Sequence, residues 1–406
     1  MAYSSLEFDN ALARVVEATR NNQLQPNLTT HAELINSIHR FRDVVETPGE
    51  TLQRIRRELY PIVCTRIIIE NGILDELVKK TSIDSNWGFP AQDLAVSTGN
   101  DQSQIVRVLR LLAATNIVEE VDEETYKTTP VANLLHSPMQ VGMVKQITNG
   151  LIPIMGQIAP FMQSHSNSLE SPRENGLWEF THGKPMFEQF QTDLAMKADF
   201  DAAMSGRRLT DPWYTIYPAN TELQISELKP DRALAVDVGG GKGHDLVAFR
   251  QAFPDLPGEC ILEDLPETLA PIREKSKNHQ GISTVTLKEY DFFTPQPVKG
   301  ARIYFFREVL HNWPDSRALA ILKNTVSAMD SNYSRILIEE VVVPAKGAGA
   351  AIAGLDIAMM LMLGGMERTA KQWKKLLDDA GLEIVKIWEQ RGNPASVIEA
   401  KIKTAA

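Results

Sequence analysis

The chain has 406 residues, enough for two or three domains with sizeable hydrophobic cores. Its 42 Lys and Arg residues are outnumbered by 52 Asp and Glu, giving a formal net charge of −10 at pH 7. This acidic balance argues against nucleic acid as a partner, because phosphate binding needs a basic face. The two cysteines, Cys64 and Cys260, lie far apart and form no metal-binding spacing, so no metal is expected. Without an apolar signal segment or a charge-free run of about 20 apolar residues, a cytoplasmic protein is expected.

The first third of the chain has the pattern of helices followed by a small β wing. Residues 1–50 are predicted to form a polar helical arm, and residues 52–80 an amphipathic helix pair. A helix over residues 91–98, a turn at Gly99 and Asn100 and a helix over residues 102–115 give a helix–turn–helix pattern. Residues 117–127 alternate apolar and polar side chains about an acidic turn. We predict a winged-helix dimerisation domain over residues 51–135.

A winged helix also raises the alternative of DNA recognition. The second helix of the pattern offers only Arg107 and Arg110 as cations, and the wing is acidic. Phosphate contacts supply much of the affinity of DNA-binding proteins, so DNA binding is disfavoured. Dimerisation is the preferred interpretation of this domain.

The remaining chain divides at about residue 230. Residues 136–230 are mainly helical and rich in aromatic and methionine residues, and we expect a connector that contributes to a substrate pocket. From residue 231 onward strands alternate with helices, which predicts a doubly wound α/β sheet. The expected strands cover residues 233–238, 259–263, 285–287, 302–306, 336–342, 383–389 and 395–402. The last two are joined by a short link and are predicted to form an antiparallel hairpin at the sheet edge.

A buried strand turns on glycines into a helix at residues 235–244. Gly239, Gly241 and Gly243 allow positive φ and the close approach of a ligand, and the helix start offers unpaired N–H groups. A dinucleotide fingerprint would need glycine where the chain has His244, and there is no Gly-Lys-Ser/Thr sequence of a P-loop.

Two acids, Glu263 and Asp264, follow about 20 residues later, where a ribose presents its hydroxyls. The pattern favours S-adenosylmethionine (SAM) as the cofactor, with Asp264 the stronger candidate for the ribose. A plain tight strand–helix turn is the alternative.

A histidine, His311, follows the fourth expected strand, at the carboxyl edge where such sheets bind ligands. A phenol has a pKa of about 10 and is mostly protonated at neutral pH, whereas an imidazole with a pKa of about 6.5 is suited to remove its proton. Glu340 and Glu367 lie on the next strand and before the next helix, and a carboxylate can fix the tautomer of an imidazole. The alternatives are a packing role for His311, a surface position for Glu367, and Glu339 in place of Glu340.

Six motifs occur in order along the chain: Asp-Val-Gly-Gly-Gly-Lys-Gly (237–243), Glu-Asp-Leu-Pro (263–266), Tyr-Asp-Phe-Phe (290–293), Arg-Glu-Val-Leu-His-Asn-Trp-Pro-Asp (307–315), Glu-Val-Val-Val-Pro (340–344) and Gly-Gly-Met-Glu-Arg-Thr (364–369). Together they resemble the class I SAM-dependent O-methyltransferases of the caffeate and flavonoid type, including fungal secondary-metabolite members. The resemblance covers the whole chain. It implies a Rossmann-like seven-stranded methyltransferase sheet, with residues 231–406 binding SAM, and a homodimer formed through the N-terminal domain.

The resemblance also assigns roles to residues. It makes His311 the general base, flanked by Glu340 and Glu367, with no metal. The cofactor-binding residues that it implies are Gly239, Gly241, Asp264, Asp291, Phe292 and Arg307, and Trp313 either stacks on the adenine or lies in the core. The acceptor-lining residues that it implies are Phe187, Met204, Met359, Met360 and Leu363. Such a pocket suits a flat, apolar phenolic or enolic metabolite.

Two positions depart from the family pattern: Asn312 stands where many members have aspartate, and Arg307 where plant members have lysine. Some fungal proteins of this scaffold keep SAM bound as a fixed charge and catalyse dehydration or pericyclic rearrangement. Cations available for that alternative are Arg307, His311, His136, Arg207 and Arg208. A winged-helix regulator that senses SAM is the third hypothesis.

Overall fold

The computed structural model describes residues 4–83, 87–165, 176–205, 211–275, 281–389 and 395–403. The chain forms two compact units. The first contains Met1–Pro153 and Gln189–Arg207, and the second contains Ile154–Glu188 and Arg208–Ala406. The finer division into four segments that the sequence suggests stays a prediction.

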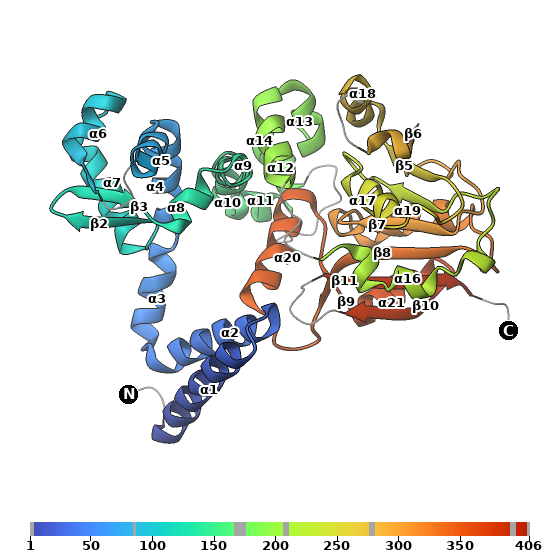
Figure 1. Ribbon diagram of the computed structural model, residues 1–406, viewed down its shortest axis with the longest axis horizontal. Helices are drawn as coiled ribbons and strands as arrows, with labels where there is room; N and C mark the ends of the chain where they lie inside the picture. The colour runs from blue at the N-terminus through green and yellow to red at the C-terminus, as the bar shows by residue number, and fades with distance from the viewer. Residues whose placement is uncertain are drawn as a thin grey trace. The chain divides into compact units, whose positions relative to one another are not determined.

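The N-terminal arm is a pair of packed helices, α1 (Ser5–Leu24) and α2 (Leu28–Val45), followed by α3 (Pro48–Arg57) (Figure 1). All three begin with a side-chain cap, from Ser4, Asn27 and Thr47, which satisfies N–H groups that the first turn leaves unpaired. Polar sequence and strong caps therefore explain why this segment is helical although it buries little of its own surface.

The winged helix is present as predicted. It contains α4 (Leu59–Glu70), α5 (Ile73–Ile83), α6 (Ala91–Thr98), α7 (Gln102–Ala114) and a three-stranded sheet in the order β1 (Phe89–Pro90), β3 (Thr125–Thr128), β2 (Val118–Asp122). Gly99 ends α6 at a φ of 72°, and the Asp101 side chain caps α7. Its core includes Leu77, Leu109 and Tyr126.

Three helices and one π turn complete the first unit: α8 (Pro130–Leu135), α9 (Pro138–Gln146), η1 (Ile147–Leu151) and α14 (Leu194–Ser205). α14 packs on α9 at Gly142, where a Cβ would collide with the backbone of Asp199 and with Ala202. Two helices, α10 (Ile152–Gly156) and α13 (Met186–Thr192), span the boundaries between the units.

The second unit contains the predicted sheet, with strands β4 (Ala235–Val238), β5 (Cys260–Asp264), β6 (Thr286–Glu289), β7 (Ile303–Arg307), β8 (Arg335–Val343), β10 (Leu382–Glu389) and β11 (Ala395–Ile402). The spatial order is β10-β11-β8-β7-β4-β5-β6, and the two-residue β9 (Arg368–Thr369) pairs with β8. β4 to β8 pair in parallel, while β11 is antiparallel to both neighbours. The expected C-terminal hairpin is thereby confirmed; its link lies outside the described residues.

Helices cover both faces of this sheet, as the alternation of strands and helices predicts. The helices and short helical turns of this unit are α11 (Ile158–Ser164), α12 (Leu177–His182), α15 (Trp213–Ile216), α16 (Ala219–Glu222), η2 (Ile225–Glu227), α17 (His244–Ala252), α18 (Pro266–Lys275), η3 (Ile282–Thr284), η4 (Leu310–Asn312), α19 (Asp315–Val326), α20 (Ala350–Leu363) and α21 (Ala370–Asp379).

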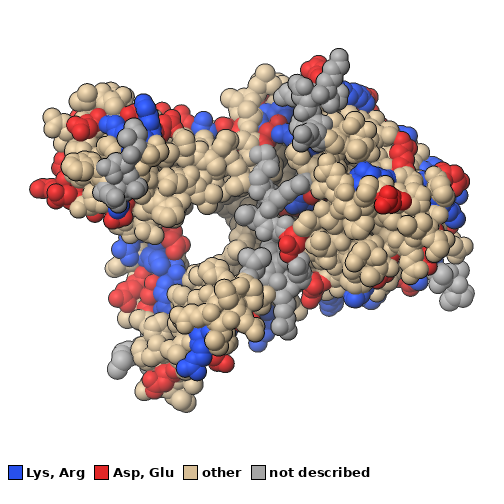
Figure 2. Space-filling model, viewed as in Figure 1, with Lys and Arg blue, Asp and Glu red and all other residues tan. Residues whose placement is uncertain are grey.

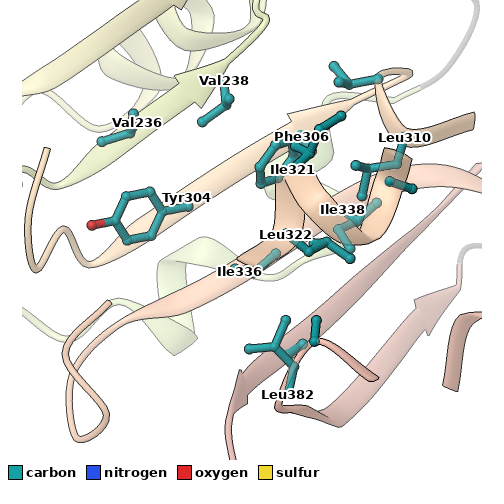
Figure 3. Packing of buried hydrophobic residues seen from close by; sticks show 14 of the residues in the cluster. Val236, Val238, Tyr304, Phe306, Leu310, Ile321, Leu322, Ile336, Ile338 and Leu382 are labelled. Carbon is teal, nitrogen blue, oxygen red and sulfur yellow. The ribbon is translucent and has the colours of Figure 1, made fainter. Parts of the chain in front are cut away.

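The central strands are buried on both faces, so side chains alternate between two hydrophobic cores. Val236, Phe306 and Ile338 belong to the same core cluster as residues of α19 (Figure 3). Phe305 and Leu337 point to the opposite core. This arrangement leaves the carboxyl ends of β4, β5, β7 and β8 at one edge, near which Asp264, Arg307 and Glu340 lie.

Candidate active site and cofactor-binding loop

His311 lies on the short turn η4, just beyond the end of β7. The chain leaves the strand through Glu308, whose φ of 51° is uncommon for a residue other than glycine. His311 is 3% exposed, and the turn packs against α20. The imidazole is therefore held in a largely dry environment at the ligand-binding edge of the sheet.

Glu367 binds the imidazole directly. His311 Nδ1 lies 2.7 Å from Glu367 Oε1, and both side chains are buried. An ionised carboxylate only accepts hydrogen bonds, so the proton belongs on Nδ1. Nε2 then carries the lone pair, which is the state that a general base requires.

Glu340 binds the backbone of the turn that carries His311. Its Oε1 accepts hydrogen bonds from the backbone N–H groups of Leu310 at 2.7 Å and His311 at 3.1 Å. Glu339 pairs with Arg307, with Arg307 Nε 3.2 Å from Glu339 Oε2. Alternation along β8 thus separates the two neighbouring carboxylates, as expected from the strand geometry.

The segment from Gly365 to Arg368 also holds the His311 turn in place, through contacts with the backbone of that turn. A Cβ at Gly365 would collide with the carbonyl oxygen of His311, and Met366 N–H donates to that same oxygen at 2.9 Å. The fully buried Arg368 donates to the carbonyl oxygens of Leu310 and Trp313 and to Asp315. Gly365 and Arg368 both fall within the motif over residues 364–369, but the motif alone predicts neither contact.

Two opposing effects act on the pKa of His311. Burial alone would lower it, but the hydrogen bond to Glu367 and the negative charges of Glu340 and Glu367 raise the pKa above its ordinary value. Burial raises the pKa of Glu340, and the nearby His311 and Arg368 oppose that rise. The site therefore favours a protonated imidazole, which is the product of proton abstraction.

We expect Gly365→Ala to lower catalytic activity by about 100-fold, the scale reported for a displacement of about 1 Å at a reacting group. The new Cβ would push the segment away from the His311 carbonyl and loosen the contact between His311 and Glu367. Gly354→Ala on α20 is the matched control, because nothing lies within 4 Å of its Cβ. Turnover and thermal unfolding should be measured for both; equal activity would contradict the role of Gly365.

The glycine loop has the backbone that its sequence predicts. Gly239, Gly241 and Gly243 adopt φ values of 72°, 59° and 73°. A Cβ at Gly240 would overlap the carboxylate of Asp237. The loop therefore packs tightly over the end of β4. Larger side chains in place of these glycines would occupy space that a ligand needs to approach the backbone.

Asp264 lies against this loop at the end of β5. Its Oδ2 accepts from Gly241 N–H and its Oδ1 from Leu265 N–H, both at 2.8 Å. Burial raises the pKa of Asp264. Glu263 points elsewhere: it is fully buried, accepts a 2.8 Å hydrogen bond from Gln296, and burial raises its pKa to about 7. Of the two acids, Asp264 is the one beside the glycine loop.

Arg307 is enclosed by acids. Its NH1 group lies 2.6 Å from Asp245 Oδ2 on α17, in addition to the contact with Glu339. Burial alone would lower the pKa of Arg307, but these two carboxylates raise it. Asp237, which the sequence analysis did not select as a site residue, is buried nearby, and burial together with Asp245 and Asp264 raises its pKa well above normal. The carboxyl oxygens of Asp237 and Asp264 lie against the glycine loop, and such oxygens can accept hydrogen bonds from the hydroxyl and ammonium groups of SAM.

The other residues assigned to the cofactor lie at the ends of neighbouring elements. Phe292 is the aromatic neighbour of Gly239, with a ring atom 3.5 Å from the position of a Cβ there. Asp291 accepts from Phe293 N–H at 2.9 Å and is exposed. Trp313 is only 5% exposed and packs edge-on against Phe292 and Phe293, which places it in the core.

The residues assigned to the acceptor are divided between the units. Met359 and Leu363 are buried in the last turn of α20, whereas Met360 is half-buried. Phe187 on α13 is 40% exposed. Met204 lies on α14 of the first unit and stays a prediction.

The electrostatic alternative also involves three other cations. His136 pairs with Asp75 in the first unit, with His136 Nε2 3.0 Å from Asp75 Oδ1. Arg207 and Arg208 lie outside the described residues. Within the described ranges, no three His, Cys, Asp or Glu side chains are arranged to hold a metal ion, and no helix could cross a membrane.

Comparison with known proteins decides the family. A model of the O-methyltransferase domain matches residues 164–383. The chain belongs to the O-methyltransferase family. It is 34% identical over 344 residues to the O-methyltransferase asqD of Emericella nidulans, covering 83% of this chain and 86% of that protein. It is 31% identical over 361 residues to the O-methyltransferase lepI of Aspergillus flavus, covering 88% and 90% of the two chains.

Solved structures of similar proteins cover nearly the whole O-methyltransferase chain. LepI in complex with SAM matches with a TM-score of 0.85 and 27% identity, covering 97% of this chain and 99% of that one. A structure described as a pericyclic reaction enzyme has the same TM-score and identity and covers 97% and 100%. OxaC with sinefungin and meleagrin matches with a TM-score of 0.84 and 26% identity, covering 98% and 100%. The enzyme is a SAM-dependent member of the fungal secondary-metabolite branch, as the resemblance implied.

Proposed function

We propose that this O-methyltransferase moves the methyl group of SAM to a hydroxyl of a small phenolic or enolic metabolite, with His311 as the general base. The buried 2.7 Å contact between His311 Nδ1 and Glu367 supports the proposal most directly. It leaves Nε2 free to take a proton, and it stabilises the imidazolium that results.

In this mechanism the acceptor hydroxyl gives its proton to His311 Nε2, and the oxygen becomes a nucleophile. Glu367 compensates the new charge on the imidazolium, while Glu340 and Arg368 hold the turn on which His311 stands. SAM supplies the methyl group as an electrophile when it is bound. The buried setting of His311 keeps water from competing for the proton.

The glycine loop and the strand ends would hold the cofactor. Asp264 is assigned to the ribose hydroxyls and Phe292 to the adenine. Gly239 and Gly241 allow the backbone to approach the ligand closely. Arg307, held by Asp245 and Glu339, fixes α17 against β8, so its role is to support the site rather than to contact the cofactor.

The test is release of S-adenosylhomocysteine by purified enzyme with SAM and a panel of phenols and enolic polyketides. We expect release that depends on at least one acceptor of this class. Substrate conversion without S-adenosylhomocysteine release would contradict methyl transfer.

The pH dependence of kcat/KM gives a second prediction. Only neutral His311 can accept a proton, so activity should fall as the pH drops through its pKa, which lies above the ordinary value of about 6.5. The acid limb of the profile should therefore have its midpoint above pH 6.5. Glu367→Gln removes the charge that raises this pKa and should move the midpoint to lower pH. A midpoint that the Glu367→Gln change leaves in place would argue against His311 as the titrating base.

A SAM-dependent pericyclase or dehydratase is the second candidate, favoured by the similarity to the pericyclic reaction enzyme. In that case SAM would contribute its charge and keep its methyl group. Arg307 is a weak candidate for the additional charge, because two carboxylates already neutralise it. The contact between His311 and Glu367 is better suited to proton removal, because it stabilises the imidazolium that forms.

The homodimer and the cytoplasmic location stay predictions. The first unit supports the dimer with a stripe of exposed apolar residues on α4, formed by Leu59, Val63 and Ile67. We expect light scattering to give the mass of a dimer and Val63→Asp to weaken it. A monomer at micromolar concentration would contradict the prediction.

The winged helix has few features of a DNA reader. Glu119, Glu120 and Asp122 are exposed on its wing, and Figure 2 shows acidic and basic side chains interspersed over the face in view. We therefore do not propose the transcription regulator.

A further inference from the structure

α20 is an apolar helix with one charged residue. Among its 14 residues only Asp356 is ionisable, and the helix packs against the His311 turn and against α12. A carboxylate costs free energy in apolar surroundings unless it is paired or hydrogen-bonded. The partner of Asp356 therefore indicates why an acid stands there.

That partner is the backbone of Glu367. Glu367 N–H donates to Asp356 Oδ1 at 2.8 Å. The preceding N–H, of Met366, donates to the carbonyl oxygen of His311 at 2.9 Å. Two consecutive N–H groups thus tie one segment to both α20 and the turn that carries the base.

The contact acts on a buried group with little freedom. Glu367 is 3% exposed, so without Asp356 its N–H would lose its acceptor in a place that water barely reaches. Gly365 already lies against the His311 carbonyl, so the segment cannot shift toward that turn. The segment could therefore move only away from His311. The hydrogen bond to Asp356 restrains the backbone of Glu367 against that movement.

We propose that Asp356 is a positioning residue for the proton transfer: by fixing the backbone of Glu367, it sets the Glu367 carboxylate on Nδ1 of His311. This inference rests on the proposed role of His311 as the base. Asp356 acts through Glu367 and needs no contact with the imidazole or the cofactor. Because α20 also carries Met359 and Leu363, the same contact links the proposed acceptor wall to the base.

The pKa of His311 is the direct readout, measured by NMR titration of the full-length protein labelled at histidine Cε1. Asp356→Leu keeps a side chain that branches at Cγ but has no acceptor, so it should release Glu367 and lower the pKa of His311 by about one unit. Asp356→Asn keeps an oxygen acceptor and should leave the pKa near the wild-type value. Ile357→Leu, at an exposed neighbouring position of α20, is the matched control for changes in the helix.

Kinetics give an independent readout. Asp356→Leu should lower kcat by about 10- to 100-fold, as expected for a displaced catalytic group, while the Kd for SAM stays unchanged. If the leucine variant does not fold, Asp356→Ala removes the same acceptor without added bulk and is measured in its place. Rescue by Asp356→Asn separates the loss of the acceptor from a general structural effect.

Glu367→Gln separates failure of this inference from failure of the proposed function. If Glu367→Gln lowers the pKa of His311 and Asp356→Leu does not, the positioning role of Asp356 is overturned and the base assignment stands. If neither variant changes that pKa, the coupling between Glu367 and His311 is overturned, and with it the basis of both proposals.

Discussion

Replacing His311 with alanine should abolish most methyl transfer and leave SAM binding intact. A positioned general base contributes about 10²- to 10⁴-fold, and a loss of that size is expected in kcat with a good phenolic acceptor. The cofactor loop does not depend on the imidazole, since Gly241 is held by Asp264 at the end of a different strand. The Kd for SAM from calorimetry should therefore stay within about twofold of the wild-type value. Such a change is small, because a tenfold change in Kd corresponds to about 1.4 kcal/mol of binding free energy.

The choice of acceptor makes this experiment specific. A phenol whose electron-withdrawing substituents lower its pKa below about 7 is mostly ionised at neutral pH and needs no base. His311→Ala should therefore lose much less activity with that acceptor than with one whose pKa is about 10. An equal loss with both acceptors would contradict proton removal as the role of His311 and indicate a role in binding or packing.

Replacing Asp264 with alanine should weaken SAM binding strongly and leave the His311 site intact. Its carboxylate holds the glycine loop through Gly241 N–H and is assigned to the ribose hydroxyls. A hydrogen bond to a charged group contributes about 1.5–3 kcal/mol, so the Kd should rise by roughly 10- to 150-fold. Calorimetric titration with SAM measures the change directly.

Two controls accompany Asp264→Ala. Asp264→Asn keeps an acceptor but loses the charge, and its Kd should be intermediate. Asp255→Ala removes an exposed carboxylate from the connection after α17 and should bind SAM as the wild type does. If Asp264→Ala binds SAM as tightly as Asp255→Ala, Asp264 has no part in the cofactor site.

Local patterns predicted most of the fold because each depends on residues close in sequence. The apolar runs at residues 235–238 and 303–306 became the buried central strands, and Gly99 ended the predicted helix with positive φ. The glycine loop and the histidine after the fourth strand followed from the same kind of pattern. The resemblance then assigned Glu367 to His311, and their contact joins positions 56 residues apart.

Other features depend on packing between distant segments and carry no local signal. Glu340 accepts from backbone N–H groups, and Arg307 is shared between Asp245 and Glu339. Gly365 is required by a carbonyl oxygen on another turn, which no spacing in the sequence reveals. The position of Trp313 could not be predicted either. The sequence around it fits both stacking on adenine and a place in the core, and only its packing against Phe292 and Phe293 distinguishes these two positions.

The most direct test of the account follows the methyl group itself. The enzyme is incubated with SAM labelled in its methyl group and an acceptor selected from the panel, and mass spectrometry locates the label. We predict that the label appears on an oxygen of the acceptor, with one S-adenosylhomocysteine formed for each methylated product. An acceptor that is converted while the label stays in SAM would contradict methyl transfer and favour the pericyclase.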